Sequence, residues 1–352
     1  MIEATEYLRL AVQNGAADIF FVAGSPASQR INRRLSHLTG DKLLPADTER
    51  IISELYGLAN RSMDAYSKNG DDDFSFAIPG LARFRVSTYR QRGSLAAVIR
   101  VVSFSIPDWQ ELGIPEAVME LSKVTSGLVL FTGTAGSGKS TTQACLIDRI
   151  NKTRDCHIIT LEDPIEYLHR NAMSIVSQRE IAIDTTDYLS ALRACLRQAP
   201  DVILLGEMRD AETIRTAMTA AETGHTVIAT LHTKGTASSI DRVIDAFPAE
   251  QQGQIRIQLA SVLNTVVSQQ LVPATDGSLI SAFEIMGTNS AVKNLIRDGK
   301  THQLPATIAS SGAEGMVSMD QSLIELYEGG KITKETAVEY ADNPEQVKRR
   351  LQ

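Results

Sequence analysis

The sequence of 352 residues has few cysteines, no long apolar run and no excess of positive charge. Its cysteines, Cys145, Cys156 and Cys195, lack zinc or redox spacing, which favours buried or half-buried free thiols of a cytoplasmic protein. No run approaches the roughly 18 apolar residues of a membrane span, so we expect no membrane insertion. Met1 to Leu10 carries two glutamates and no apolar core, which argues against a signal peptide. A net charge of −7 gives the whole chain no electrostatic footprint for nucleic acid.

What the sequence contains is typical of a soluble globular protein. Apolar residues make up 43% and charged residues 22%, and the length suggests two or three domains with buried cores. The segment 105–116, with two prolines and the only tryptophan, is typical of a linker between domains.

One stretch organises the rest of the chain. Gly133 to Ser140 fits the phosphate-binding pattern G-x-x-x-x-G-K-[ST], after an apolar run at 128–131 and before a helical pattern at 140–151. A strand, a glycine loop and a helix let backbone N–H groups surround phosphates, while the lysine reaches the β- and γ-phosphates and the serine ligates Mg²⁺. We therefore predict that ATP and Mg²⁺ bind at Gly133, Thr134, Ala135, Gly136, Ser137, Gly138, Lys139, Ser140 and Thr141.

Near-continuous apolar strands alternate with helices around this loop. We expect strands at 127–132, 156–161, 202–206 and 226–231, which predicts a buried, mostly parallel sheet. Ligands bind such sheets beyond the carboxyl ends of the strands.

Three further motifs adjoin these strands. Glu162, Asp163 and Glu166 follow the second strand, and any of them could polarise a water or order Mg²⁺, or the acids could simply cap a turn. Glu207 follows the third strand in the manner of a Walker B acid. His225 and His232 flank the fourth; the second could contact the γ-phosphate, whereas a lone histidine is more often a polar core residue.

The first hundred residues predict a small antiparallel sheet with helices on one side. We expect helices at 4–13 and 47–67, a strand at 18–23, a turn of solvated carboxylates at 69–73, and three strands between 74 and 102. Arg83 and Arg85 fall on the face opposite Phe84 and Val86. These arginines and Arg100 either pair with carboxylates across the sheet or point at phosphates, and the residues alone leave both open.

The motifs GTAGSGKSTT, TLEDPIEY, ILLGEMRD and AAETGH…ATLHT together resemble the Walker A, Asp, Walker B and His boxes of type II/IV secretion ATPases. Three more stretches resemble the PilT family, the twitching-motility retraction ATPases of type IV pili; they lie at 82–93, at 240–252, and at 291–300 followed by 315–333. The stretch at 16–28 departs from that family's pattern.

The resemblance implies a role for each matching residue. Glu166 would be the general base, Glu207 the Walker B acid that holds Mg²⁺ with Ser140, and Lys139 the phosphate-binding lysine. Arg85 and Arg100 would reach the nucleotide, and the catalytic set would be completed by His225 and His232.

The resemblance also implies the architecture: an N-terminal PAS-like α+β domain at 1–104, the linker at 105–116, an α/β RecA-like P-loop core at 117–290 and a helical region at 291–352. It implies a cytoplasmic homohexamer at the inner face of the cytoplasmic membrane, which drives pilus retraction through an inner-membrane platform protein. Alternatives are a related pilus-assembly or secretion ATPase, a DNA-translocating RecA-like motor, a small-molecule kinase and a regulatory subunit without activity.

Overall fold

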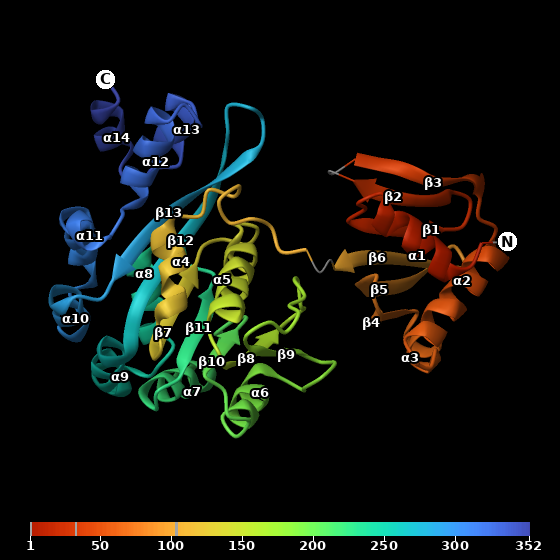
Figure 1. Ribbon diagram of the computed structural model, residues 1–352, viewed down its shortest axis with the longest axis horizontal. Coiled ribbons are helices and arrows are strands. Elements are labelled where there is room, and N and C mark those ends of the chain that lie inside the picture. Colours follow the sequence, from red (N-terminus) through yellow and green to blue (C-terminus); the bar gives the residue numbers. More distant parts are fainter. Residues whose placement is uncertain (1, 32–33, 103–104) are drawn as a thin grey trace. The chain divides into compact units, whose positions relative to one another are not determined.

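The computed structural model describes residues 2–31, 34–102 and 105–352 (Figure 1). The chain divides into two compact units, which we call the N-terminal unit (residues up to 105) and the C-terminal unit (residues from 106). Three residues, Glu166–Leu168, group with the N-terminal unit. The boundary predicted at residue 104 falls on 103–104, outside the described residues.

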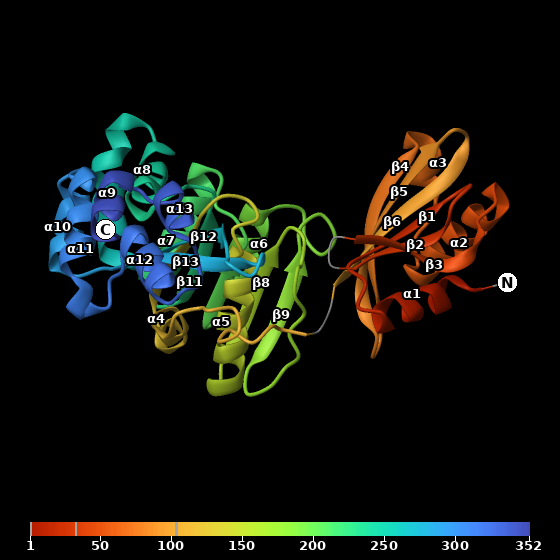
Figure 2. The same ribbon diagram turned by 90° about the horizontal axis from the view of Figure 1, so that it is seen from above.

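The N-terminal unit is an antiparallel sheet with helices packed against one face (Figure 2). Its strands run in the order β3-β2-β1-β6-β5-β4. In chain order its elements are α1 (Ala4–Gln13), β1 (Asp18–Val22), β2 (Pro26–Ile31), β3 (Arg34–Lys42), α2 (Pro45–Leu58), α3 (Asp64–Asn69), β4 (Asp71–Ile78), β5 (Ala82–Gln91) and β6 (Ser94–Val102).

Side chains along each strand point alternately to the two faces of the sheet, and those on one face form the core of this unit. Phe84 and Val86 of β5 are fully buried with Ile19 of β1, against α1 and α2. The single helix predicted at 47–67 is wrong, because the chain leaves α2 after Leu58 and Asn60 takes a left-handed conformation with φ 49°.

Two further details of the N-terminal unit differ from expectation. The turn predicted at 69–73 is mostly the start of β4, and Asp72 accepts hydrogen bonds from Arg61 Nε (3.0 Å) and Tyr56 Oη (3.0 Å) instead of being merely solvated. The strands β2 and β3, about half or more of whose residues are polar, were not predicted from the sequence.

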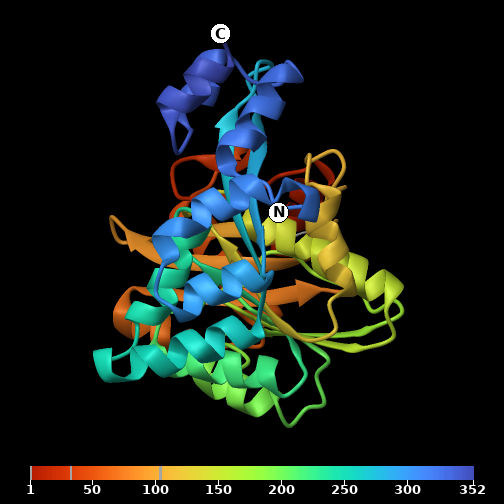
Figure 3. The same cartoon turned by 90° about the vertical axis from the view of Figure 1, so that its left-hand side faces the viewer.

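The C-terminal unit is a layered α/β structure (Figure 3). Its first half comprises α4 (Glu116–Met119), η1 (Glu120–Lys123), β7 (Gly127–Thr132), α5 (Lys139–Thr153), β8 (His157–Glu162), β9 (Ile175–Glu180), α6 (Tyr188–Cys195), β10 (Val202–Leu205), α7 (Ala211–Glu222) and β11 (Thr226–Leu231). Its second half comprises α8 (Thr236–Asp245), α9 (Ala249–Val262), β12 (Leu263–Pro273), β13 (Leu279–Gly287), α10 (Ser290–Arg297), η2 (Thr301–Gln303), α11 (Leu304–Ser310), η3 (Gly312–Glu314), α12 (Met319–Glu328), α13 (Lys334–Glu339) and α14 (Pro344–Arg350).

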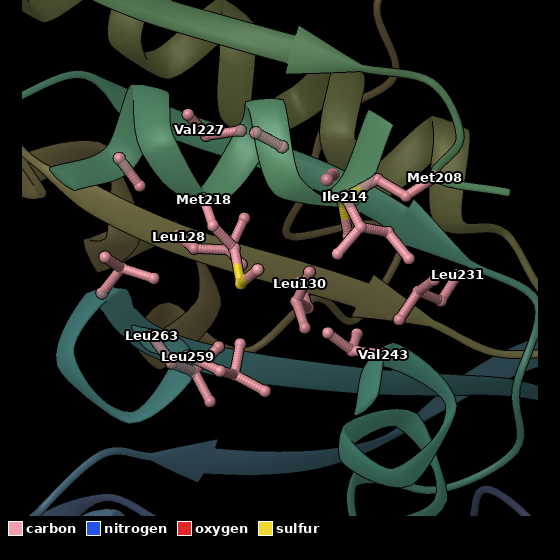
Figure 4. Close-up of a cluster of buried hydrophobic side chains, with 14 of the residues drawn as sticks. Leu128, Leu130, Met208, Ile214, Met218, Val227, Leu231, Val243, Leu259 and Leu263 are labelled. Carbon is pink, nitrogen blue, oxygen red and sulfur yellow. The ribbon is translucent and has the colours of Figure 1, made fainter. Parts of the chain in front are cut away.

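The sheet of this unit runs in the order β13-β12-β7-β11-β10-β8-β9, and only the β12–β13 pair is antiparallel. Both faces are buried: Leu128 and Leu130 of β7 face one cluster, and Val129 and Phe131 face the other. Figure 4 shows the first cluster, in which Met218 of α7 lies close to Leu128. The expected parallel sheet is therefore confirmed, and its continuous apolar strands are explained by burial on both faces.

Residues 106–116 of the predicted linker group with the C-terminal unit and pack against it. Ile114 is buried, Trp109 packs on the same cluster as α5, and the Cys145 thiol donates a hydrogen bond to the Pro107 carbonyl (3.4 Å). Among the described residues, no helix is long and apolar enough to cross a bilayer.

Candidate functional site

The glycine loop connects the carboxyl end of β7 to the start of α5. Its conformation favours glycine at three places, because Gly133, Gly136 and Gly138 have φ of 140°, 77° and 89°. At two of them a side chain would also lack room. A Cβ on Gly133 would lie 2.4 Å from the Gln269 carbonyl oxygen, and one on Gly138 would lie 2.8 Å from Gln269 Nε2. The loop is thus seated directly on β12, which leaves no room for side chains at these glycines.

Lys139 is the first residue of α5 and is almost fully buried. Its ammonium group donates to the loop's own carbonyls, Gly133 O (2.7 Å) and Thr134 O (2.8 Å). Ser140 and Thr141 follow in the first turn and are half-buried. The lysine therefore lies inside the loop that surrounds the expected phosphate position, at the positive end of α5.

Side chains far apart in sequence support this loop. Gln269 Oε1 accepts a hydrogen bond from the Thr142 hydroxyl (2.9 Å), and Gln143 Nε2 donates to the Thr230 hydroxyl (3.0 Å). All four groups are buried, so these bonds fix α5 against β12 and β11. Sequence reasoning missed Gln269, because no local pattern marks a residue that acts across the sheet.

Glu207 and His232 lie together beyond the carboxyl ends of the neighbouring strands β10 and β11. His232 Nε2 is 3.6 Å from Glu207 Oε1, and Arg209 Nη2 is 2.7 Å from Glu207 Oε2. The Met208 amide donates to the Thr230 carbonyl (3.1 Å), which ties the loop carrying Glu207 to β11. The structure thus brings together the predicted Walker B acid and one predicted histidine.

The three acids after β8 have different surroundings. Glu162 accepts hydrogen bonds from the Thr160 hydroxyl (2.6 Å) and from Gln178 Nε2 (3.2 Å), so it is tied to the sheet. Asp163 and Glu166 are exposed. Glu166 directly follows Ile165, which is buried and whose amide donates a hydrogen bond to Glu180 Oε2 (3.4 Å).

His225 lies at the other end of β11 from His232. Its Nδ1 is 2.9 Å from the Ala220 carbonyl oxygen at the end of α7. Since the two histidines are seven residues apart along a strand that rises about 3.3 Å per residue, they are about 23 Å apart. Within one chain, the structure does not bring His225 to the glycine loop, in contrast to the expectation that both histidines surround the γ-phosphate.

The arginines singled out in the N-terminal unit form a row across its sheet. Arg85 is opposite Arg100, Arg100 is opposite Asp18, and Asp18 is opposite Arg30. Asp18 bonds both neighbours, with Arg100 Nε at 3.1 Å and Arg30 Nη1 at 3.2 Å. The cross-sheet pairing considered for Arg100 is confirmed: Arg100 and Arg30 share the Asp18 carboxylate. Arg85 lies opposite Arg100 on the same face, which is the face away from the core.

The oxygen donors at the loop suit Mg²⁺. This ion prefers oxygen ligands and is usually held by one or two protein groups together with substrate phosphates and waters. The Ser140 hydroxyl in the first turn of α5 and the Glu207 carboxylate beyond β10 are such groups. Lys139, which directly precedes Ser140, provides the positive charge that phosphates require.

A glycine loop between a buried parallel strand and a helix, with an acid and a histidine at neighbouring strand ends, defines a P-loop nucleotide-binding protein. Residues 2–338 match the family model described as "Type II/IV secretion system protein". The chain belongs to this family and is a P-loop ATPase.

Two relatives and one solved structure are similar over nearly the whole chain. The type IV pilus retraction ATPase PilT of Pseudomonas aeruginosa is 41% identical over 345 residues, covering 98% of this chain and 99% of the relative. The type IV pilus ATPase PilU of the same species is 39% identical, covering 97% and 89%. A crystal structure of the pilus retraction motor PilT with bound ADP has a TM-score of 0.89 at 42% identity, covering 99% of this chain and 100% of that one.

Proposed function

We propose that this chain is the ATP-hydrolysing motor that retracts type IV pili, working as a homohexamer at the inner face of the cytoplasmic membrane. It would pass its movement to an inner-membrane platform protein. The observation that carries the proposal is a glycine loop seated on β12 with Glu207 and His232 paired beyond the ends of β10 and β11, in a chain 41% identical to a retraction ATPase over nearly its full length.

Each site residue has a distinct task in the proposed reaction. The loop amides and the Lys139 ammonium bind the β- and γ-phosphates, and Glu166 orients the attacking water in line with the γ-phosphate. His232 contacts the terminal phosphate. Ser140 and, in part through water, Glu207 would hold Mg²⁺, which would supply positive charge next to the phosphate oxygens.

Arg85 and Arg100 complete the site by binding the phosphates. Like charges directly opposite each other on adjacent strands destabilise a sheet, so the pairing of these two arginines favours an anionic ligand over a purely structural role. Lower affinity for ADP and phosphate than for ATP would then release the arginines after hydrolysis, and this difference supplies the mechanical work.

Replacing Arg85 or Arg100 by alanine tests this assignment. We expect kcat to fall by about 10²-fold in each variant, because the two side chains share the stabilisation of charge on the transferred phosphoryl group. The melting temperature should stay the same or rise in Arg85→Ala, since a repulsion between like charges is removed. Steady-state ATPase assays and thermal melts check both expectations.

Arg30→Ala is the matched control, because Arg30 belongs to the same row and also bonds Asp18. It should keep the wild-type kcat. If Arg85→Ala and Arg100→Ala both hydrolyse ATP at the wild-type rate, the arginines are structural and the assignment fails.

Deleting the gene tests the biological role. Loss of a retraction motor should leave cells with excess surface pili that do not twitch, whereas loss of an assembly motor should leave none. Electron microscopy with pilus counting, and complementation by the intact gene, measures this. Normal pilus number and normal twitching after deletion would contradict the retraction role. The other candidate is a second ATPase of the same apparatus, because the identity to PilU is nearly equal to the identity to PilT.

A further inference from the structure

Tyr188 is the first residue of α6 and belongs to none of the sequence motifs. Its hydroxyl nevertheless lies near the acids that follow β8 and β10. Asp187 caps α6 by accepting a hydrogen bond from the Ser190 amide (2.8 Å), which fixes where the tyrosine leaves the backbone. The half-buried ring packs on the hydrophobic cluster beneath β8 and β10. A Cβ built on Gly206 would lie 2.8 Å from the Tyr188 hydroxyl. Because Gly206 directly precedes Glu207, the hydroxyl lies beside the backbone that carries the Walker B acid.

The hydroxyl has acidic neighbours but forms no hydrogen bond with any described residue. Burial raises the pKa of Tyr188 above its usual range, and the charges of Asp163, Glu207 and Glu162 raise it further, while Arg209 acts in the opposite direction. Tyr188 therefore stays protonated at physiological pH. It is a hydrogen-bond donor among carboxylates, which accept hydrogen bonds.

Arg209 and His232, the two side chains paired with Glu207, do not by themselves hold its carboxylate in one orientation. Arg209 bonds Glu207 Oε2, but the arginine side chain is 72% exposed while that of Glu207 is only 17% exposed. An ion pair with so exposed a partner is screened by water and holds a carboxylate weakly. His232 Nε2 is 3.6 Å from the other oxygen, which is too long for a hydrogen bond. The Tyr188 hydroxyl lies beside Gly206, the residue before Glu207, and the tyrosine is half-buried; a hydrogen bond from such a donor to a carboxylate is stronger than one made in water.

We propose that Tyr188 is a positioning residue of the ATPase site, whose hydroxyl donates a hydrogen bond to the Glu207 carboxylate when nucleotide is bound and keeps that carboxylate oriented toward the glycine loop. This inference rests on the role given to Glu207 in the proposed function. It adds to the site a residue from α6 that acts through Glu207 and does not touch the nucleotide.

Tyr188→Phe tests the proposal, because it removes one oxygen and keeps the ring that fills the cluster. We expect kcat to fall about tenfold, the effect of losing one hydrogen bond to a charged group, while the KM for ATP changes less than about twofold. Tyr327→Phe, at a half-buried tyrosine of α12, is the matched control and should keep the wild-type kcat and KM.

Binding of a fluorescent ADP analogue gives a readout that does not depend on turnover. Without Mg²⁺, the affinity of Tyr188→Phe should equal that of the wild type, which also shows that the glycine loop is folded. With Mg²⁺, the affinity should be about three- to fivefold weaker than wild type, because the loosened carboxylate is the group that holds the ion's waters.

Two results would overturn the proposal. One is a wild-type kcat in Tyr188→Phe; the other is an equal loss of ADP affinity with and without Mg²⁺, which would indicate a packing role only. Glu207→Gln separates this proposal from the proposed function. If Glu207→Gln is inactive while Tyr188→Phe is fully active, only the role of Tyr188 fails. If Glu207→Gln turns over normally, the role of Glu207 fails with it.

Discussion

Lys139→Ala is expected to abolish measurable ATP hydrolysis and to weaken ATP binding by more than about 10²-fold. The ammonium group is the one cation of the glycine loop, and it donates hydrogen bonds to Gly133 O and Thr134 O. Because Lys139 is almost fully buried, its charge attracts phosphates more strongly than it would in water. Equilibrium binding of a fluorescent ATP analogue and a phosphate-release assay measure the two losses.

Lys152→Ala is the control for that experiment. Lys152 lies on the same helix, is 65% exposed and pairs with Asp148, so its loss should change hydrolysis little. The lysine in the loop also holds two carbonyls, so the melting temperature of Lys139→Ala must be compared with that of the wild type. Hydrolysis above about a tenth of the wild-type rate in a folded Lys139→Ala protein would contradict the phosphate-binding role.

Glu166→Gln is expected to bind ATP normally and to turn it over more than about 10³-fold more slowly. The amide keeps the size of the side chain but cannot accept the proton of the attacking water, and general bases contribute effects of about this size. Glu166 is exposed and no described residue forms a hydrogen bond with its carboxylate, so the substitution should leave the melting temperature unchanged. Single-turnover hydrolysis, with ATP binding measured in parallel, checks the expectation.

Glu162→Gln gives a contrast within the same motif. Glu162 is bonded to Thr160 and Gln178, so we expect this change to lower stability, with a smaller effect on the rate than Glu166→Gln. Wild-type turnover in Glu166→Gln would transfer the role of base to another acid, and Asp163 is the next candidate because it is also exposed.

Local patterns predicted most of the C-terminal sheet and much of the N-terminal unit. The strands expected at 127–132 and 226–231 are β7 and β11 to the residue, and α1 has the predicted bounds. The strands β2, β3, β9, β12 and β13 were missed. Strand β3 is mostly exposed and lies at the edge of its sheet. Because neither of its faces is buried, its sequence lacks the alternation of apolar and polar residues by which a strand is recognised.

The sequence alone determined the glycine loop and the residues in it, because the motif depends only on residues close together in the chain. Glycines stand where φ is positive, and a lysine and a serine stand at the start of a helix. It also determined which strands are buried. Only the tertiary structure decided that Gln269 supports the loop, that His225 lies at the far end of β11, and that Tyr188 faces the backbone before Glu207. These facts depend on which strands are neighbours and on their register, and strand pairing is set by packing across the whole unit rather than by residues adjacent in sequence.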